Sequence, residues 1–546
     1  MRRATLLLLL LCGVTFLAGL GRPAIGDSDE AFYAEAAREM VERGDWLTPY
    51  YNYEVRFQKP ILFYWLVAAT YTVAGVGETQ ARLWAALSGV GLAFVVLGAG
   101  RRWFDEPTAI IAAAIVGTAF GYFSMGRLAL PDLPLAFFIT LTIVAALAGT
   151  VEGDERHPRR WLYVAGAAAG CAFLTKGPVG LLLPALVLVP IWWLERQRLH
   201  VAPAAVFGSM LIAVAIGAPW YVAMTATHGR AYFESFFVGD NLERFTTSRF
   251  NDPRPFWFYV PIVLGGMLPW TPLLAVFAPV LRARAVRFQA SPRTWWLILW
   301  AALPLLFFTG SIGKQPRYVL PVLPPLALLL ANAIVRRWPA HGERRDPVVQ
   351  IPGILIALFL GVMAVLLYRA RPLIVMVPPV FINGAVMAIA IASGIVLGAA
   401  LAPRSRTMPA CVAASAALTF AGLQYALSPA GHDPVQNMAA LVLEHRTGSE
   451  PVVTFRVFVR NLIFYTHVQQ DDLESEGEVV EFLRSNRRVL CVIGADELER
   501  IRRTASVTTR TLGEVLYFNA SAVKLRTLFS PDPDRDLDRV LLVTNR

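Results

Sequence analysis

The chain has 546 residues, of which 56% are hydrophobic and only 16% are charged, and its mean hydropathy is +0.51. This composition excludes an ordinary soluble globular enzyme and is typical of a polytopic membrane protein. The net charge of +11 does not indicate nucleic-acid binding, because the arginines occur in short clusters between apolar runs, where cytoplasmic loops collect them.

The first apolar segment, residues 5–20, follows a basic start at Arg2 and Arg3. These features are shared by a cleavable signal peptide, with residues 24–26 as a weak cleavage site, and by a retained signal anchor. We favour the anchor, because acidic residues that look functional follow at once and many apolar segments come later.

Twelve further apolar runs approach the length of about 20 residues that a spanning helix needs. They lie near residues 80–100, 107–123, 132–150, 161–175, 178–194, 203–223, 257–280, 294–312, 318–335, 351–368, 374–401 and 408–426. Every second loop is basic, through Arg101, Arg102, Arg156, Arg159, Arg160, Arg196, Arg198, Arg282, Arg284, Arg287, Arg336, Arg337, Arg344, Arg345, Arg404 and Arg406. The positive-inside rule assigns these loops to the cytoplasm.

Residues 60–77 form an ambiguous apolar segment that is rich in aromatic side chains. If this segment crossed the membrane, every later basic loop would lie on the wrong side, so we predict an interfacial helix with Pro60 in its first turn. About 13 transmembrane helices then remain, with the N-terminus in the cytoplasm and the C-terminus outside. The acids at 27–30 and the later polar loops converge on the outer face.

The hydropathy falls from about residue 428. Segments 451–459, 488–494 and 539–544 are rich in Val and Leu and are predicted strands, whereas 434–446, 476–485 and 495–503 are predicted helices. The sequence therefore predicts two domains, a membrane domain over 1–427 and a small extracytoplasmic α/β domain over 428–546. The second domain carries no visible chemistry of its own, and we interpret it as a packing or docking module.

An acidic cluster follows the first apolar segment. Ser28, with Asp29 and Glu30 directly after it, is typical of a helix N-cap, and we predict a helix over 28–43. The acids then either stabilise the helix dipole or serve catalysis. We favour catalysis, because Lys59 returns to the same face and a carboxylate there is suited to act as a general base.

Polar residues at later turns are further candidates. Asp132 follows Pro131 at the start of an apolar run, where it either caps a helix or provides a second catalytic acid, with Arg127 as an anion ligand. Lys176 lies at a tight turn between two spans, and it either snorkels to the interface or faces the site.

Cations and hydroxyls near the outer face suit an anionic ligand. The aromatic loop 224–256 either lies on the membrane surface or covers a pocket and contributes Arg244. A phosphate diester held at membrane level needs cations and a hydroxyl donor. Lys59, Arg317 and Tyr318 are suited to supply them.

A metal ion is left open. Asp27 and Asp29 form a D-x-D pair, which in soluble enzymes often binds a metal together with a nucleotide sugar. A membrane donor without a diphosphate does not require that cation, so no cofactor is certain and a divalent metal is an alternative. The four cysteines have no metal-site or disulfide spacing.

These motifs resemble those of the aminoarabinose transferases, which belong with family 39 and the protein mannosyltransferases among the polyprenyl-phosphate glycosyltransferases of GT-C fold. The resemblance covers residues 1–335. It rests on Asp29, Glu30, Tyr33, Ala34, Glu35, Met40, Gly44, Asp45, Trp46, Pro49, Phe57, Lys59, Pro60, Tyr64, Trp65, Leu130 to Asp132, Leu174 to Gly177, Tyr232 to Phe237, Arg244, Phe245, Pro255 to Tyr259, Leu268 to Trp270, and Tyr318 to Leu320.

The resemblance implies an inverting transferase that takes a sugar from undecaprenyl phosphate and transfers it to a lipid, glycan or protein at the outer face of a bacterial inner membrane, as in lipid A modification. It implies that Asp29 is the base and that Lys59 and Tyr318 hold the donor phosphate. Asp132, Lys176 and Arg244 would complete the pocket. The alternatives are a protein O-mannosyltransferase-like activity and, in another class, a lipid or sugar transporter.

Two positions depart from the aminoarabinose pattern. An acid precedes the motif lysine in those enzymes, whereas this chain has Gln58, and Arg317 adds a cation beside Tyr318. Both changes suit a neutral or acidic sugar at least as well as a cationic one. A transporter usually carries its ionisable residues near the bilayer midplane, whereas the candidates here lie at the outer ends of spans, which favours an enzyme.

Overall fold

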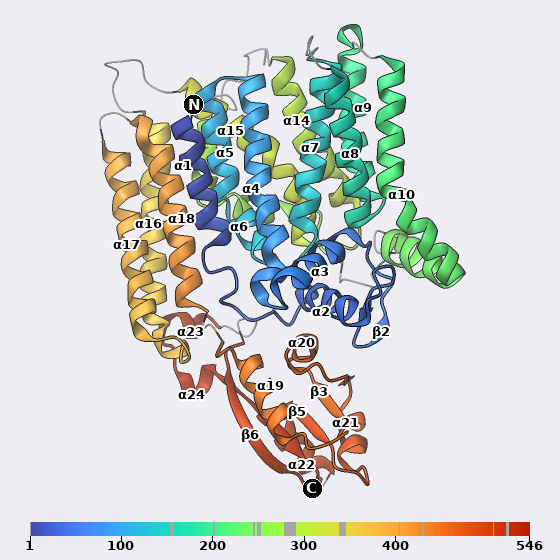
Figure 1. The fold of residues 1–546 in the computed structure, drawn as a ribbon. Coiled ribbons are helices and arrows are strands. Elements are labelled where there is room, and N and C mark those ends of the chain that lie inside the picture. Colours follow the sequence, from blue (N-terminus) through green and yellow to red (C-terminus); the bar gives the residue numbers. More distant parts are fainter. Residues whose placement is uncertain are drawn as a thin grey trace.

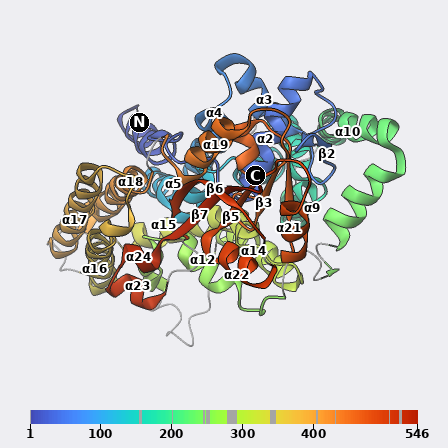
Figure 2. The same cartoon turned by 90° about the horizontal axis from the view of Figure 1, so that it is seen from below.

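A helical bundle carries a small sheet domain at one end (Figure 1). The computed structural model describes residues 2–152, 158–199, 202–243, 246–247, 253–277, 291–337, 346–402, 405–428, 431–505, 507–519 and 524–546. The N-terminus lies at the end of the bundle away from the sheet domain, and the C-terminus lies within that domain (Figure 1). Seen from below, the sheet domain lies across the end of the bundle (Figure 2).

The bundle consists of helices that run back and forth along its length. Its elements are α1 (Arg2–Cys12) with η1 (Gly13–Leu17), α4 (Glu78–Trp103), α5 (Glu106–Thr118), α6 (Phe120–Gly126), α7 (Asp132–Thr150), α8 (Pro158–Lys176), α9 (Val179–Leu194), η2 (Arg196–Arg198), α10 (Pro203–Phe233), η3 (Glu234–Glu243), α12 (Tyr259–Gly266), η4 (Thr271–Phe277), α14 (Pro292–Gly310), η5 (Pro316–Val322), α15 (Leu323–Arg336), α16 (Pro347–Arg369), η6 (Arg371–Leu373), α17 (Pro379–Leu401), η7 (Ser405–Thr407) and α18 (Met408–Ala426).

Among the described residues, seven helices are long and apolar enough to cross a membrane, or up to nine if each of two bent pairs is one span. A multi-pass membrane protein is therefore confirmed, whereas the predicted count of 13 is not. The predicted basic residues at 156, 282, 284, 287, 344, 345 and 404 lie outside the described residues.

Two predicted spans are broken rather than continuous. The α5–α6 pair bends by 52° and the α12–η4 pair by 104°. The two breaks are joined to each other, because Phe120 N donates to Leu268 O at 2.8 Å and Trp270 Nε1 donates to Thr118 Oγ1 at 3.0 Å. A helix break within a membrane leaves backbone N–H and C=O groups without their helical partners, and these groups need other hydrogen bonds. Here the N–H of Phe120 at one break is paired with the carbonyl of Leu268 at the other.

A short outer subdomain lies between the bundle and the sheet domain. It contains α2 (Asp29–Arg43), the antiparallel pair β1 (Tyr50–Tyr51) and β2 (Glu54–Val55), and α3 (Leu62–Ala74). The predicted helix over 28–43 is confirmed, with Ser28 as its N-cap and Gly44 at φ +69° as its C-cap. The 13 residues of α3 rise about 20 Å, which is less than a hydrocarbon core and agrees with an interfacial helix.

The sheet domain holds five strands in the order β4-β3-β5-β7-β6. Its elements are α19 (Pro434–His445), β3 (Val452–Phe455), α20 (Leu462–Thr466), β4 (Gln470–Leu473), α21 (Glu476–Leu483), β5 (Leu490–Gly494), α22 (Ala495–Ala505), β6 (Arg510–Tyr517), α23 (Leu525–Phe529), α24 (Pro533–Asp536) and β7 (Asp538–Thr544). The three predicted strands and three predicted helices are confirmed. Strands β4 and β6 were not predicted, because both lie at sheet edges and are largely polar.

Hydrogen bonds join the sheet domain to the outer subdomain. Asn52 Nδ2 donates to Gln470 O at 2.8 Å, and Gln470 N donates back to Asn52 Oδ1 at 3.1 Å. Tyr465 Oη accepts from Ile25 N at 2.7 Å and donates to Glu78 at 2.9 Å. The predicted domain boundary at 427/428 stays a prediction and falls between α18 and α19.

A buried acid on α2 makes the stability of the outer subdomain sensitive to pH. Glu39 is fully buried and accepts hydrogen bonds from Tyr53 N in the β1–β2 turn. Burial, together with the nearby charge of Glu35, raises the pKa of Glu39 to about 7. The folded protein therefore takes up a proton that the unfolded chain binds only near pH 4.5, and stability falls as the pH rises from 4.5 to 7.

We expect Glu39→Gln to raise the melting temperature more at pH 8 than at pH 5.5, because the amide keeps the acceptor for Tyr53 N and removes a charge whose cost grows as the pH rises from 4.5 to 7. Thermal unfolding in detergent at the two pH values measures the difference. Glu42→Gln, at a half-exposed position of the same helix, is the control. An equal shift at both pH values would contradict the buried charge.

Candidate active site

A cavity of about 430 Å³ opens where separate loops meet at one end of the bundle. Six of the eight residues predicted for catalysis or phosphate binding line it: Asp29, Lys59, Asp132, Lys176, Arg317 and Tyr318. The rest of the wall is mostly apolar and includes Leu182, Leu183, Phe236, Phe237, Phe307 and Phe308. The cavity thus joins a charged end to a hydrophobic one.

Local backbone structure brings these side chains to the cavity. Asp132 is the first residue of α7 and Lys176 is the last residue of α8. Gly177 ends α8 with a φ of +75°, and a Cβ there would lie 2.8 Å from the ring of Phe236. A tight turn that requires glycine therefore places Lys176 beside Asp132.

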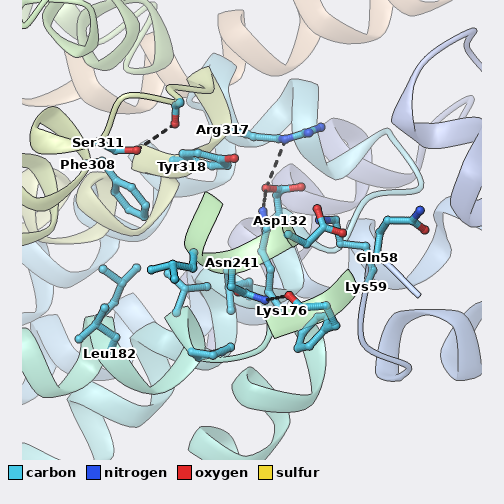
Figure 3. A pocket seen from close by; sticks show the side chains of 18 of the residues that line it. Gln58, Lys59, Asp132, Lys176, Leu182, Asn241, Phe308, Ser311, Arg317 and Tyr318 are labelled. Atoms are coloured by element: carbon cyan, nitrogen blue, oxygen red, sulfur yellow. Dashed lines mark hydrogen bonds and ion pairs between the residues drawn. The ribbon is translucent and has the colours of Figure 1, made fainter. Parts of the chain in front are cut away.

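A chain of alternating charges crosses the cavity. Lys176 Nζ donates to Asp132 Oδ1, and Arg317 Nε lies 3.6 Å from the same oxygen. Figure 3 shows the Asp132 carboxylate between these two cations. Arg317 also donates to Asp29 Oδ2, so helices α2, α7 and α8 and the η5 segment are linked through four side chains.

Sequence reasoning identified only one partner of a second ion pair, Lys59, and missed the other, Asp240. Lys59 Nζ donates to Asp240 Oδ1 at 3.2 Å, and the Asp240 side chain is only 2% exposed. Asp240 lies in η3, within the aromatic loop 224–256, for which the sequence left open a place on the membrane surface or over a pocket. The signal was available, because an acid between Phe237 and Asn241 in an apolar loop requires a cation nearby.

The carboxylate of Asp29 is ionised in this environment. Burial by itself raises the pKa of Asp29, but the positive charges of Arg317, Lys59 and Arg56 outweigh it and hold the pKa below its ordinary value. The side chain is 40% exposed, so a ligand in the cavity can reach it. Asp29 is therefore available to accept a proton or a hydrogen bond.

Tyr318 forms part of the cavity wall next to the cations. Its ring lies 5.3 Å from Lys176 Nζ, within the range of a cation–π contact, and 5.3 Å from the ring of Phe308. The tyrosine therefore stands between the charged end of the cavity and its aromatic wall.

Glu30 lies outside the cavity and forms a buried ion pair. Arg82 Nε donates to Glu30 Oε1 at 2.7 Å, and the two side chains are each 1% exposed. The carboxylate also accepts from Gly26 N and Ala129 N. These partners use the oxygens of Glu30 within the protein.

Two other sequence candidates remain, Arg244 and Arg127. Arg244 lies outside the described residues. Arg127, suggested as an anion ligand, instead donates to the carbonyls of Thr15, Phe16 and Ala18 and to Gln424.

The two aspartates of the D-x-D pair bond to different parts of the protein. Asp27 accepts from Val459 N and Arg460 N of the sheet domain, whereas Asp29 pairs with Arg317. Within the described residues, no group of three His, Cys, Asp or Glu side chains is placed to hold a metal ion. This arrangement offers no support for a metal at the pair.

Comparisons with known sequences find one family model and several relatives. Residues 25–233 match the family model of dolichyl-phosphate-mannose-protein mannosyltransferases. The chain is 32% identical over 379 residues to an undecaprenyl phosphate-alpha-4-amino-4-deoxy-L-arabinose arabinosyl transferase of Pseudomonas fluorescens, covering 68% of this chain and 63% of the relative. A relative from Pseudomonas savastanoi is 32% identical, with 66% of each chain covered. The match thus spans less than two thirds of these relatives.

Comparison with solved structures gives the fold. ArnT from Cupriavidus metallidurans bound to undecaprenyl phosphate superposes with a TM-score of 0.73 at 22% identity, covering 99% of this chain and 98% of that one. An Archaeoglobus fulgidus oligosaccharyltransferase has a TM-score of 0.50 at 12% identity, with 93% and 68% covered. The chain has the GT-C fold, and its resemblance to the aminoarabinose transferases is confirmed.

The two neighbouring acids differ in a way that mutation can separate. We expect Glu30→Ala to destabilise the protein by about 3–5 kcal/mol, because it leaves the buried guanidinium of Arg82 without its charge partner. Asp29→Asn, at a side chain that is 40% exposed, is expected to change the melting temperature by only a few degrees. Thermal unfolding in detergent compares them, and equal losses of stability would contradict the assignment.

Proposed function

We propose that this chain is an inverting glycosyltransferase that moves a sugar from undecaprenyl phosphate to a lipid acceptor. The observation that carries the proposal is the cavity itself, in which Lys59, Lys176, Arg317 and Tyr318 lie between a reachable carboxylate and an apolar wall. A lipid phosphate needs both cations and apolar surface. The named activity of the relatives supports the same proposal.

The reaction is one displacement at the anomeric carbon. The acceptor hydroxyl attacks, a new glycosidic bond forms, and the bond between the sugar and the phosphate oxygen breaks. The proton of the hydroxyl goes to Asp29, and the electron pair of the broken bond leaves with undecaprenyl phosphate. Lys59, Lys176, Arg317 and Tyr318 stabilise the charge that develops on that phosphate.

Asp132 acts in this proposal by holding Lys176 and Arg317 in place, since it contacts both. Glu30 is assigned to the fold rather than to chemistry, because its oxygens are already bonded. Arg244 is kept as a phosphate ligand on the sequence resemblance alone.

We also propose thirteen spans in a bacterial inner membrane: the nine candidates among the described residues, together with helices α8, α9 and α18 and the N-terminal helix. The N-terminus is then cytoplasmic and the domain over 428–546 is periplasmic. The basic residues at the ends of α4, α9 and α15 support this orientation, because these helix ends lie away from the sheet domain (Figure 1).

A protein O-mannosyltransferase-like activity is the second candidate, favoured by the family model over residues 25–233. Gln58, an uncharged residue that lines the cavity beside Lys59, also suits a neutral sugar. A panel of undecaprenyl-phosphate sugars, offered with lipid, glycan and protein acceptors and analysed by mass spectrometry, separates these substrates.

Asp29→Asn is expected to lower the transfer rate by about 10²–10⁴-fold, the usual contribution of a general base. Transfer from a radiolabelled donor in proteoliposomes measures the rate, and binding of undecaprenyl phosphate shows that the donor site persists. Unchanged transfer would remove Asp29 from its role as base.

For Lys59→Ala, we expect the KM of the donor to rise by tenfold or more while the KM of the acceptor stays within about twofold, because a charged hydrogen bond to the phosphate contributes about 1.5–3 kcal/mol. Lys524→Ala, at an exposed lysine of the sheet domain, is the control and is expected to leave both constants unchanged. Equal increases in both KM values would count against a phosphate ligand.

A further inference from the structure

The charged residues that line the cavity balance one another. Among the described residues, the lining contains three acids, Asp29, Asp132 and Asp240, and three bases, Lys59, Lys176 and Arg317. Each base contacts at least one of the acids. A donor phosphate carries a negative charge of its own, so it competes with these acids for the bases.

The acids differ in what it costs to separate them from their bases. The side chains of Asp132 and Asp240 are 4% and 2% exposed, and a buried carboxylate left without a partner is strongly destabilising. Asp29 is 40% exposed, so water can solvate it after its partner leaves. Asp132 also keeps Lys176 when Arg317 moves. The separation that costs least is therefore that of Asp29 from Arg317.

Arg317 has the donors that a phosphate needs. Its guanidinium carries five N–H donors in a planar fork that matches two phosphate oxygens, and its Nε has no hydrogen-bond acceptor within the described structure. A small rotation of the side chain exchanges the Asp29 oxygen for a ligand oxygen in the same cavity. Lys59 and Arg56 stay close enough to Asp29 to stabilise its charge.

We infer that Arg317, besides contacting the donor phosphate, couples donor binding to release of the base. In the empty site its guanidinium holds the Asp29 carboxylate in an ion pair. When the donor phosphate binds, the guanidinium turns to the phosphate, and Asp29 becomes free to accept a hydrogen bond from the acceptor hydroxyl. This inference rests on the proposed function, and it makes donor binding precede productive acceptor binding.

Binding of undecaprenyl phosphate, without a sugar, tests the coupling independently of catalysis. Dissociation constants are measured for the wild type, Asp29→Asn, Arg317→Gln and the double variant. Asp29→Asn is expected to bind at least about fivefold more tightly than the wild type, the lower end of typical coupling between sites, because Arg317 no longer has to leave an acid. In the Arg317→Gln background, Asp29→Asn is expected to change binding by less than about twofold.

Other outcomes overturn the inference. If Asp29→Asn tightens binding equally in both backgrounds, the effect is general loss of negative charge and Arg317 does not couple the two events. If it does not tighten binding in the wild-type background, no competition exists. Asp27→Asn, which removes a neighbouring charge that contacts the sheet domain, is the matched control and is expected to give no tightening.

A second variant keeps the test valid if Arg317→Gln does not fold. Arg317→Lys keeps the charge but loses the planar fork, so tightening by Asp29→Asn is expected to be smaller than with arginine, and equal tightening overturns the role of the guanidinium. Failure of the proposed function gives a different result, since the wild type would then transfer no sugar from an undecaprenyl-phosphate donor in proteoliposomes, whatever its binding constants.

Discussion

A single buried guanidinium fixes the segment that carries Asp29, the carboxylate that we propose as the base. Arg82, on α4, donates to the carbonyls of Leu20, Pro23 and Ala24 and to Glu30. These bonds hold the whole connection between the first helix and α2 against the bundle. Glu30 is the residue after Asp29, so the position of Asp29 depends on this ion pair. The pair is buried, and its energetic value lies in the cost of breaking it rather than in its formation.

The sheet domain reinforces the same segment from the other side. It binds Asp27, Asn52 and Ile25, which flank α2 before and after. Asn52 adopts a φ of +56°, a left-handed conformation that asparagine adopts more readily than most residues with a side chain, and its two hydrogen bonds to Gln470 help to retain it. A domain without visible chemistry thus helps to shape the outer subdomain on which the cavity depends.

The sequence predicted elements whose signals are local. Apolar runs, the cap at Ser28 and the Val-rich strands depend on neighbouring residues, and these predictions agree with the structure. The pairing of Lys59 with Asp240, 181 positions apart, depends on tertiary structure and was not predicted. The same limit explains Arg127 and Glu30, since a polar residue at a span end looks alike in sequence whether it faces a ligand or satisfies buried carbonyls.

The broken helices show why charge and composition predict where apolar helices occur in the chain better than they predict whether those helices are straight or bent. Hydropathy sums over a window, so it cannot distinguish a straight span from the α5–α6 and α12–η4 pairs. Those breaks are possible because each supplies the partner that the other lacks. The acids and bases of the cavity also depend on partners from distant parts of the chain. Each charged side chain is stable at the edge of the membrane because a side chain of opposite charge lies beside it. An anionic ligand that enters such a balanced set competes with its internal pairs, and this competition is the physical basis of the coupling that we propose between Asp29 and binding at the cations.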